Sequence, residues 1–393
     1  MNMRLHRLVR LAGLAACAAL SSLSSAADDG WTTRFYGRLV YDASAWTGDR
    51  TGLDTSGGEV RQALLGINAG SGNWTFSANA LTATNIDPEI ENAWMEYRPG
   101  GGQWGIRAGQ FKTPNSLDEQ TSSLNISTAE RAAFTDAFGF DRRLGIALTG
   151  TGERYTAMAG LFAANINDTF SREGHAAAAR VTFVPWRGDD WTSHLGLSAR
   201  WREGGDDLPL LRYRQRPYAH QSGAILSTGS VFESDILVAA ETAFIYRRSW
   251  AAAEFAAVEA DLTGGATADF SGGYLEAGHV FGGHKTYSHG RFDALTVDRP
   301  IRKGGPGALA VAARIDTVDL SGGGVDGGGL TSEIIDITWV FDLYLLLRLD
   351  LFHADASLGS LEAGLDPVYA DAILSGLRNE TVSGMTLRFQ ASF

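Results

Sequence analysis

Strict alternation of apolar and polar residues is the feature that most constrains the fold of this chain. In residues 384–393 the apolar side chains Met385, Leu387, Phe389, Ala391 and Phe393 alternate with polar ones. Residues 35–46, 194–202 and 344–353 show the same period of two, which places apolar side chains on one face of a β-strand. A transmembrane strand needs this pattern over about 10 residues. A soluble sheet with one wet face shows it too, so a soluble periplasmic binder is the alternative class at this point.

The rest of the composition favours a membrane barrel. The most apolar stretch, residues 339–354, is interrupted by Asp342, Arg348 and Asp350, whereas a membrane helix needs about 18 uninterrupted apolar residues. The 393 residues include 48 glycines, and only 20% are charged. Such a composition is typical of short strands joined by tight turns. A strand that ends on an aromatic residue at the carboxylate, here Phe393, also looks like the signal by which the barrel-assembly machinery recognises its clients.

Residues 1–26 have the pattern of a signal peptide. Arginines at positions 4, 7 and 10 precede the apolar residues 11–20, and Ser24, Ser25 and Ala26 are small residues that a signal peptidase accepts. Cleavage near Ala26 would leave residues 27–393 as a single barrel domain, and losing the three arginines would change the formal net charge from -12 to -15. Cys17, the one cysteine, lies in a sequence similar to a lipobox. The alternatives are a lipidated cysteine and an incidental one.

Short and long connections alternate between the expected strands, as in barrels with tight periplasmic turns and longer external loops. The short ones are 70–73, 99–103, 150–153, 185–190, 247–249 and 342–344, and the long ones are 47–59, 85–91, 112–141, 165–175, 203–231, 261–269, 320–331 and 355–381. We therefore predict an all-β fold, a 16-stranded antiparallel transmembrane β-barrel. Residues 281–307 form a long connection at the short-turn end. We expect this segment to enter the periplasm, and a missed hairpin is the alternative.

Residues 112–141 form a polar connection that is unusually long. Loops beyond about 12 to 15 residues are usually functional or disordered, so we expect this one to fold inward as a constriction loop. The cations in it and directly after it are Lys112, Arg131, Arg142 and Arg143, and five acidic residues make the charge of the whole stretch slightly negative. Its selectivity therefore depends on which charges point into the lumen.

Ten arginines fall mostly on the polar faces of the expected strands: Arg38, Arg61, Arg107, Arg143, Arg180, Arg200, Arg202, Arg314, Arg348 and Arg388. An arginine that faces lipid near the bilayer centre costs about 2–4 kcal/mol, so these side chains must line water. They either attract anions, which guanidinium groups bind in bidentate fashion, or pair with Asp42, Glu96, Asp316 and Asp350. For an anion path we select Arg131, Lys112, Arg142, Arg143, Arg38, Arg61 and Arg107.

Motifs of catalysis are absent from the sequence. There is no HExxH, paired CxxC, GxSxG or phosphate-binding loop, and His279, His284 and His289 have a spacing that suits neither one helical face nor one strand face. We expect no enzyme activity, no cofactor, no metal site and no nucleic-acid partner.

The chain resembles the phosphate-selective porins O and P. The resemblance rests on GQFKTP at 109–114, TSS at 121–123, ER at 130–131, AF at 137–138, RRLG at 142–145 and NIND at 165–168, and more faintly on GALAVAARID at 307–316. It implies a homotrimeric, 16-stranded porin whose third external loop folds inward with basic residues. Phosphate-binding members carry a lysine between TSS and ER. This sequence keeps Arg131 but has Leu124, Asn125 and Ile126 in that stretch.

The sequence thus predicts a passive channel in the outer membrane of a Gram-negative bacterium. The expected solutes are small and hydrophilic, with a preference for small anions such as phosphate or polyphosphate, and the expected surroundings are outer-membrane lipid and lipopolysaccharide. The alternative function is a barrel with a plugged lumen that serves a structural or surface-binding role.

Overall fold

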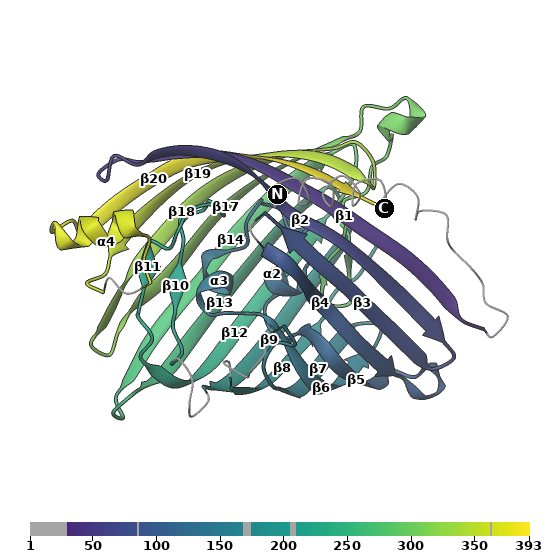
Figure 1. Ribbon diagram of the computed structural model, residues 1–393. Coiled ribbons are helices and arrows are strands. Elements are labelled where there is room, and N and C mark those ends of the chain that lie inside the picture. Colours follow the sequence, from purple (N-terminus) through teal and green to yellow (C-terminus); the bar gives the residue numbers. More distant parts are fainter. Residues whose placement is uncertain (1–29, 85, 168–173, 205–209, 362–363) are drawn as a thin grey trace, which may run out of the picture.

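Sixteen strands form one closed antiparallel barrel (Figure 1), as predicted. The computed structural model describes residues 30–84, 86–167, 174–204, 210–361 and 364–393. Each strand pairs with its neighbours along the chain, and β20 (Asn379–Ser392) closes the ring on β1 (Thr32–Gly48). The expected signal peptide, including Cys17, lies outside the described residues.

The other barrel strands are β2 (Asp54–Ser71), β3 (Trp74–Ala83), β4 (Ile86–Tyr97), β5 (Trp104–Lys112), β6 (Arg142–Thr151), β7 (Tyr155–Phe162), β8 (His175–Phe183), β9 (Trp191–Glu203), β12 (Phe232–Tyr246), β13 (Ser249–Leu262), β14 (Thr267–Phe281), β17 (Ala308–Gly322), β18 (Val325–Val340) and β19 (Leu345–Leu358). The connections contain the helices η1 (Pro99–Gly101), α2 (Leu117–Gln120), α3 (Ala133–Ala137), η2 (Ile301–Lys303) and α4 (Pro367–Leu374). They also contain the short strand pairs β10 (Arg214–Gln215) with β11 (Leu226–Ser227) and β15 (Tyr287–Ser288) with β16 (Arg291–Phe292).

The two faces of the barrel wall differ as the alternation predicts. Leu197 of β9 and Leu275 of β14 point outward and are each 62% exposed, whereas the inward Arg200 of β9 is 2% exposed. The strands are long enough to cross a bilayer, and an apolar exterior is what lipid requires. No helix among the described residues is long and apolar enough to span a membrane.

Exposed aromatic side chains gather at the short-turn end. Trp74, Trp104, Trp186, Trp191 and Trp339 each lie beside a short connection and are 41–58% exposed. Tryptophan is favoured where hydrocarbon meets the polar headgroups, so this row fits a membrane interface.

The terminal residue takes part in closing the barrel. The backbone N–H of Phe393 donates to the carbonyl of Gly37 at 3.1 Å, and its own carbonyl accepts from Gly37 at 3.3 Å. A Cβ atom at Gly37 would lie 2.5 Å from the Phe393 ring. The ring therefore covers β1 at a position where only glycine leaves room.

Four connections that we expected to be long are shorter in the structure. The one expected over 85–91 is replaced by β4, which begins at Ile86, and the other three are reduced to residues 49–53, 263–266 and 323–324. The last is a tight turn in which Gly323 and Gly324 both have positive φ values, +57° and +84°, as two-residue hairpins prefer. The expectation of a loop over 320–331 was wrong because glycines at 327–329 belong to β18 and have no side chains to show the alternation.

The expectation that residues 281–307 enter the periplasm was wrong for the part around Lys285 and Phe292. Lys285 and Phe292 are 3% and 4% exposed, and Lys285 contacts Asn125 of the long connection between β5 and β6. This part therefore turns back into the barrel, and it contains the hairpin that was the alternative, β15–β16, which is separate from the ring. The helix η2 of the same connection is exposed. The alternation of short and long connections showed that this segment is unusually long for the short-turn end. Its mixture of polar and apolar residues did not show that part of it folds into the barrel.

Candidate functional site

The long connection between β5 and β6, residues 113–141, is called loop 3 here, and it lies against the inner wall of the barrel. In Figure 1 its helices α2 and α3 appear between the two ends of the barrel. Carboxylates of the wall accept hydrogen bonds from its backbone. Glu254 of β13 accepts from the N–H groups of Leu117 and Asp118 at 2.8 and 2.6 Å, and Asp350 of β19 accepts from Ala129 at 2.6 Å.

Arginines of the same wall donate to carbonyl groups of loop 3. Arg348 of β19 donates to Ile126 and Thr128, both at 2.7 Å, and Arg388 of β20 donates to Ala129 at 2.6 Å. Buried backbone groups need such partners. The wall from β13 to β20 thus fixes the course of loop 3 through charged side chains.

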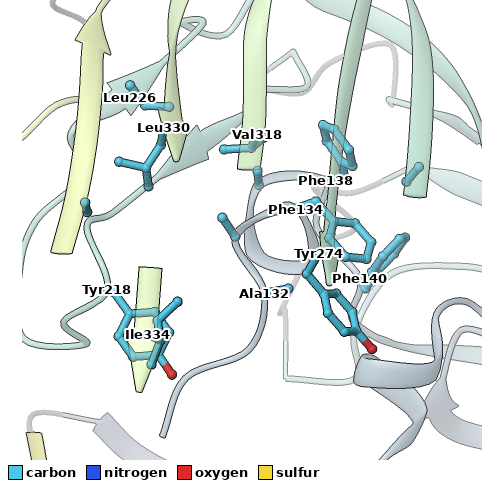
Figure 2. Close-up of a cluster of buried hydrophobic side chains, with 14 of the residues drawn as sticks. Ala132, Phe134, Phe138, Phe140, Tyr218, Leu226, Tyr274, Val318, Leu330 and Ile334 are labelled. Atoms are coloured by element: carbon cyan, nitrogen blue, oxygen red, sulfur yellow. The ribbon is translucent and has the colours of Figure 1, made fainter. Parts of the chain in front are cut away.

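Aromatic packing holds the other end of loop 3. Phe134 and Phe138 are fully buried, and Figure 2 shows Phe134 beside Tyr274 of β14, with ring centroids 6.4 Å apart. The ring of Phe138 packs against the ring of Tyr213, with centroids 6.1 Å apart. Tyr213 belongs to residues 210–231, called loop 5 here, so loops 3 and 5 share one apolar cluster inside the barrel.

The opposite side of loop 3 faces β1 to β6 and carries charges that remain partly exposed. Glu119 of α2 binds two cations, Lys112 of β5 at 2.9 Å and Arg131 of loop 3 at 3.0 Å. Glu91 of β4 binds Arg38 of β1 at 3.2 Å and Arg142 of β6 at 2.8 Å.

Arg61 of β2 completes this set, since it binds Glu130 of loop 3 at 3.4 Å. We call the set the basic cluster; its members are Arg38, Arg61, Lys112, Arg131 and Arg142 with Glu91, Glu119 and Glu130. The five cations are 11–24% exposed, whereas Arg314, Arg348 and Arg388 on the other wall are 1–3% exposed. Five cations against three carboxylates leave an excess of two positive charges at a surface that water can reach.

The carboxylates of loop 3 stay charged within this cluster. Burial alone would raise the pKa of Glu130, but Arg61, His220 and Arg388, with a smaller effect of Arg216, outweigh it and lower this pKa to about 2. The pKa of Glu119 is also lowered because its neighbouring cations, Arg131 first, outweigh the effect of burial. Glu119 and Glu130 therefore both count as negative charges in the basic cluster.

The structure brings together five of the seven residues that we selected for an anion path. Arg107 is separate; it binds Glu96 at 2.8 Å towards the short-turn end, with its guanidinium 4.1 Å from the centre of the Trp94 ring. Arg143 of β6 is 5% exposed and donates to the carbonyl of Ala163 at 3.4 Å.

The pairing interpretation of the ten arginines holds for some of them, and attraction of anions stays a prediction. Arg388 pairs with Asp42 at 2.6 Å, and Arg107 pairs with Glu96, as the pairing interpretation expected. Asp316 and Asp350 were wrongly expected to pair with arginine, because each accepts a hydrogen bond from a loop 3 backbone N–H instead.

A row of arginines on loop 5 was missed at the sequence level. Arg212, Arg214 and Arg216 are exposed or partly exposed and alternate with buried Tyr213 and Gln215. Burial and the like charges of Arg212 and Arg216 lower the pKa of Arg214, so the three guanidinium groups lie close together. The motif LRYRQR was a signal for this row, but it lay in a segment read only as a long loop.

Within the part of the chain that the structure describes, no group of three or more histidine, cysteine or acidic side chains is arranged to hold a metal ion.

A closed sixteen-stranded barrel with an apolar exterior and a charged interior defines the class of outer-membrane porins. The chain belongs to the phosphate-selective porin O and P family, whose model matches residues 34–342. Its place is the outer membrane of a Gram-negative bacterium. An uncharacterised protein of Caulobacter vibrioides is 33% identical over 298 residues, which cover 72% of this chain and 60% of that protein. The chain thus spans less than two thirds of the length of this curated relative.

Solved structures of porins have the same fold. The anion-selective porin from Comamonas acidovorans has a TM-score of 0.60 at 10% identity, covering 92% of this chain and all of that one. The outer-membrane channel DcaP of Acinetobacter baumannii has a TM-score of 0.56 at 12% identity, covering 94% and 99%. The trimer form of OmpT from Vibrio cholerae has a TM-score of 0.55 at 10% identity, covering 92% and 100%. At these identities the likeness concerns the fold alone.

Proposed function

We propose that the protein is a passive channel for small hydrophilic solutes that prefers anions, with phosphate or polyphosphate as the favoured class. The basic cluster carries this proposal, because its excess positive charge lies between loop 3 and the wall of β1 to β6. The family name and the description of the Comamonas porin as anion-selective support it. The protein acts without chemistry on its solutes and is not an enzyme.

The mechanism is electrostatic selection at a narrowing. In this mechanism loop 3 occupies part of the lumen, and solutes pass beside the basic cluster, between loop 3 and the wall of β1 to β6. Positive charge in a confined, low-dielectric channel raises the local concentration of anions and excludes cations. Guanidinium groups that keep some exposure can exchange a carboxylate partner for a passing phosphate oxygen. The arginine row of loop 5, Arg212 to Arg216, extends this surface towards the loop end of the barrel.

The net charge of the chain does not oppose this selection. The acidic residues of the lumen other than Glu91, Glu119 and Glu130 are largely engaged by wall arginines or by loop 3, as Asp42 is by Arg388 at 2.6 Å. Exposed charges more than about 8–10 Å away are screened at physiological salt, so the local excess at the narrowing decides the sign of selectivity.

We further propose a homotrimer in lipopolysaccharide-containing membrane, assembled through recognition of the strand that ends at Phe393. A trimer form of the Vibrio cholerae protein supports the oligomer. The barrel-closing contacts of Phe393 with Gly37 give its ring a structural role in the finished barrel as well.

Reversal potentials in planar bilayers test the role of the basic cluster. Arg131→Ala and Lys112→Ala should each shift the reversal potential in a salt gradient towards cation selectivity, because each removes positive charge from the basic cluster. Arg247→Ala is the matched control, since Arg247 pairs with Asp190 on the surface and its side chain is 62% exposed. Unchanged reversal potentials in both cluster variants would remove these residues from the selective region.

The second candidate is a plugged barrel with a structural or surface-binding role. The observation that favours it is the amount of protein inside the barrel, since loop 3, loop 5 and residues 284–293 all contact the lumen. It predicts that purified protein gives no conductance and no liposome swelling.

A further inference from the structure

The connection between β14 and β17 forms an arm that reaches beneath loop 3. Its two sides are joined by backbone hydrogen bonds from Asp298 to Gly282 at 2.8 Å and from Thr296 to His284 at 2.9 Å. At the tip, the carbonyl of Gly290 accepts from Arg180 of β8 at 2.7 Å. Residues 282–298, called the arm here, are therefore tied both to their own base and to a distant strand of the wall.

Lys285 joins the arm to loop 3. Its ammonium group donates to the carbonyl of Asn125 at 3.2 Å and to the hydroxyl of Ser127 at 2.7 Å. The same group lies 4.9 Å from the ring centre of Trp250 and 4.6 Å from that of Phe292. The residue is 3% exposed, so the ammonium faces loop 3 and two aromatic rings instead of the water of the lumen.

The partners of Lys285 connect it to the wall. The Ser127 hydroxyl donates to Glu276 of β14 at 2.6 Å, and the same carboxylate accepts from the Trp250 indole at 2.8 Å. Arg314 of β17 donates to its other oxygen at 2.7 Å. Removing the ammonium group or one of its partners would leave the remaining buried polar groups without a hydrogen-bond or charge partner, which is costly.

We propose that Lys285 is a positioning residue of the channel, through which the arm fixes the wall-facing side of loop 3. This inference rests on the proposed channel function. Loop 3 bears Arg131 and Glu119 on its opposite side. The position of residues 125–127 therefore determines where these two charged side chains lie relative to the wall of β1 to β6. The arm is reached from the short-turn end, so the setting of loop 3 depends on a segment at the face of the barrel opposite the external loops.

Single-channel recording of Lys285→Met tests this role. The variant keeps a side chain of similar length but loses the charge and both hydrogen bonds, so we expect several-fold more frequent transitions between conductance levels. Lys303→Met is the matched control, because Lys303 lies exposed in η2 of the same connection. Lys285→Arg retains the positive charge, so its frequency of transitions between conductance levels should be closer to that of the wild type.

A double-mutant comparison separates positioning from a general loss of stability. Ser127→Ala removes one partner of Lys285 from the loop 3 side and should increase the transitions as well. If the two side chains act together, adding Ser127→Ala to Lys285→Met should change little further. Ser127→Ala alone carries the test if Lys285→Met fails to give a heat-modifiable barrel.

The inference is overturned if both single variants fold and show wild-type conductance and wild-type transition frequency, or if their effects add fully. Absence of conductance in the wild-type protein would instead refute the proposed channel function, so the two failures are distinguishable.

Discussion

Charged side chains inside this barrel fall into two groups that differ in exposure. Arg314, Arg348 and Arg388 are buried between the wall and loop 3, where carboxylates and carbonyl groups accept hydrogen bonds from them. Such pairs fix a conformation more than they add stability, since desolvation offsets much of their attraction. Arg131 and Lys112 keep contact with water, so they can act on a solute.

A variant of Glu119 should shift the reversal potential in the direction opposite to that of Arg131→Ala and Lys112→Ala. Glu119→Gln removes one of three carboxylates from the basic cluster and should shift the reversal potential towards stronger anion selectivity. One unit charge at about 5 Å in water is worth about 0.8 kcal/mol, which corresponds to roughly a two- to fourfold change in the permeability ratio once screening is included. Glu153→Gln, in an exposed short turn, should have no effect. A shift towards cations would contradict the electrostatic account.

The contact of Lys285 with loop 3 should depend on pH in a defined direction. Burial lowers the pKa of Lys285 to about 8, with Glu276 and Asp336 opposing this effect and Arg348 and Arg314 adding to it. A released arm would expose an ordinary lysine with a pKa of 10.5. The packed arm therefore binds fewer protons between these values, and it gains stability as the pH rises through 8.

Between pH 7 and 9 this linkage favours the packed arm by about tenfold. Transitions between conductance levels should become rarer over this interval in the wild type. Lys285→Arg, which does not titrate there, should lack this component. Equal pH dependence in the two proteins would assign the titration to another group.

At the scale of elements, the sequence predicted strands better than connections. Strand β20 could be predicted because apolar and polar side chains alternate along it without a break. The first part of β18 could not, because its glycines have no side chains to show the alternation. The placement of residues 112–141 followed from length and polarity. The arm was not predictable, because Lys285 and Phe292 acquire their burial only through partners on loop 3 and β13 that lie far away in the sequence.

Loops 3 and 5 should loosen together when their shared aromatic cluster is weakened. Phe138→Ala removes a fully buried ring, and such truncations typically cost about 3–5 kcal/mol of packing. The barrel strands hold one another through their own backbone ladder, so heat-modifiable migration should persist while single-channel conductance increases. Phe255→Ala, at an outward position that is 57% exposed, is the control. An unchanged conductance with a folded barrel would show that this cluster does not hold the narrowing.

At the scale of the whole molecule, the lumen is asymmetric. The wall from β13 to β20 anchors loop 3, and the wall from β1 to β6 supplies most cations of the basic cluster. The barrel and its strand number could be predicted from the sequence, and all five cations of the basic cluster were among the residues selected from it. The division of the arginines between the two walls could not be predicted, because alternation shows which face a residue lies on but not which loop covers it.

The most direct test of the account is the reversal potential of the purified wild-type protein in a planar bilayer with a potassium chloride gradient. An anion-preferring channel should give a stable conductance and a reversal potential whose sign indicates preference for chloride over potassium, with current reduced when phosphate is added. A reversal potential that indicates preference for potassium, or the absence of any conductance from folded protein, would contradict it.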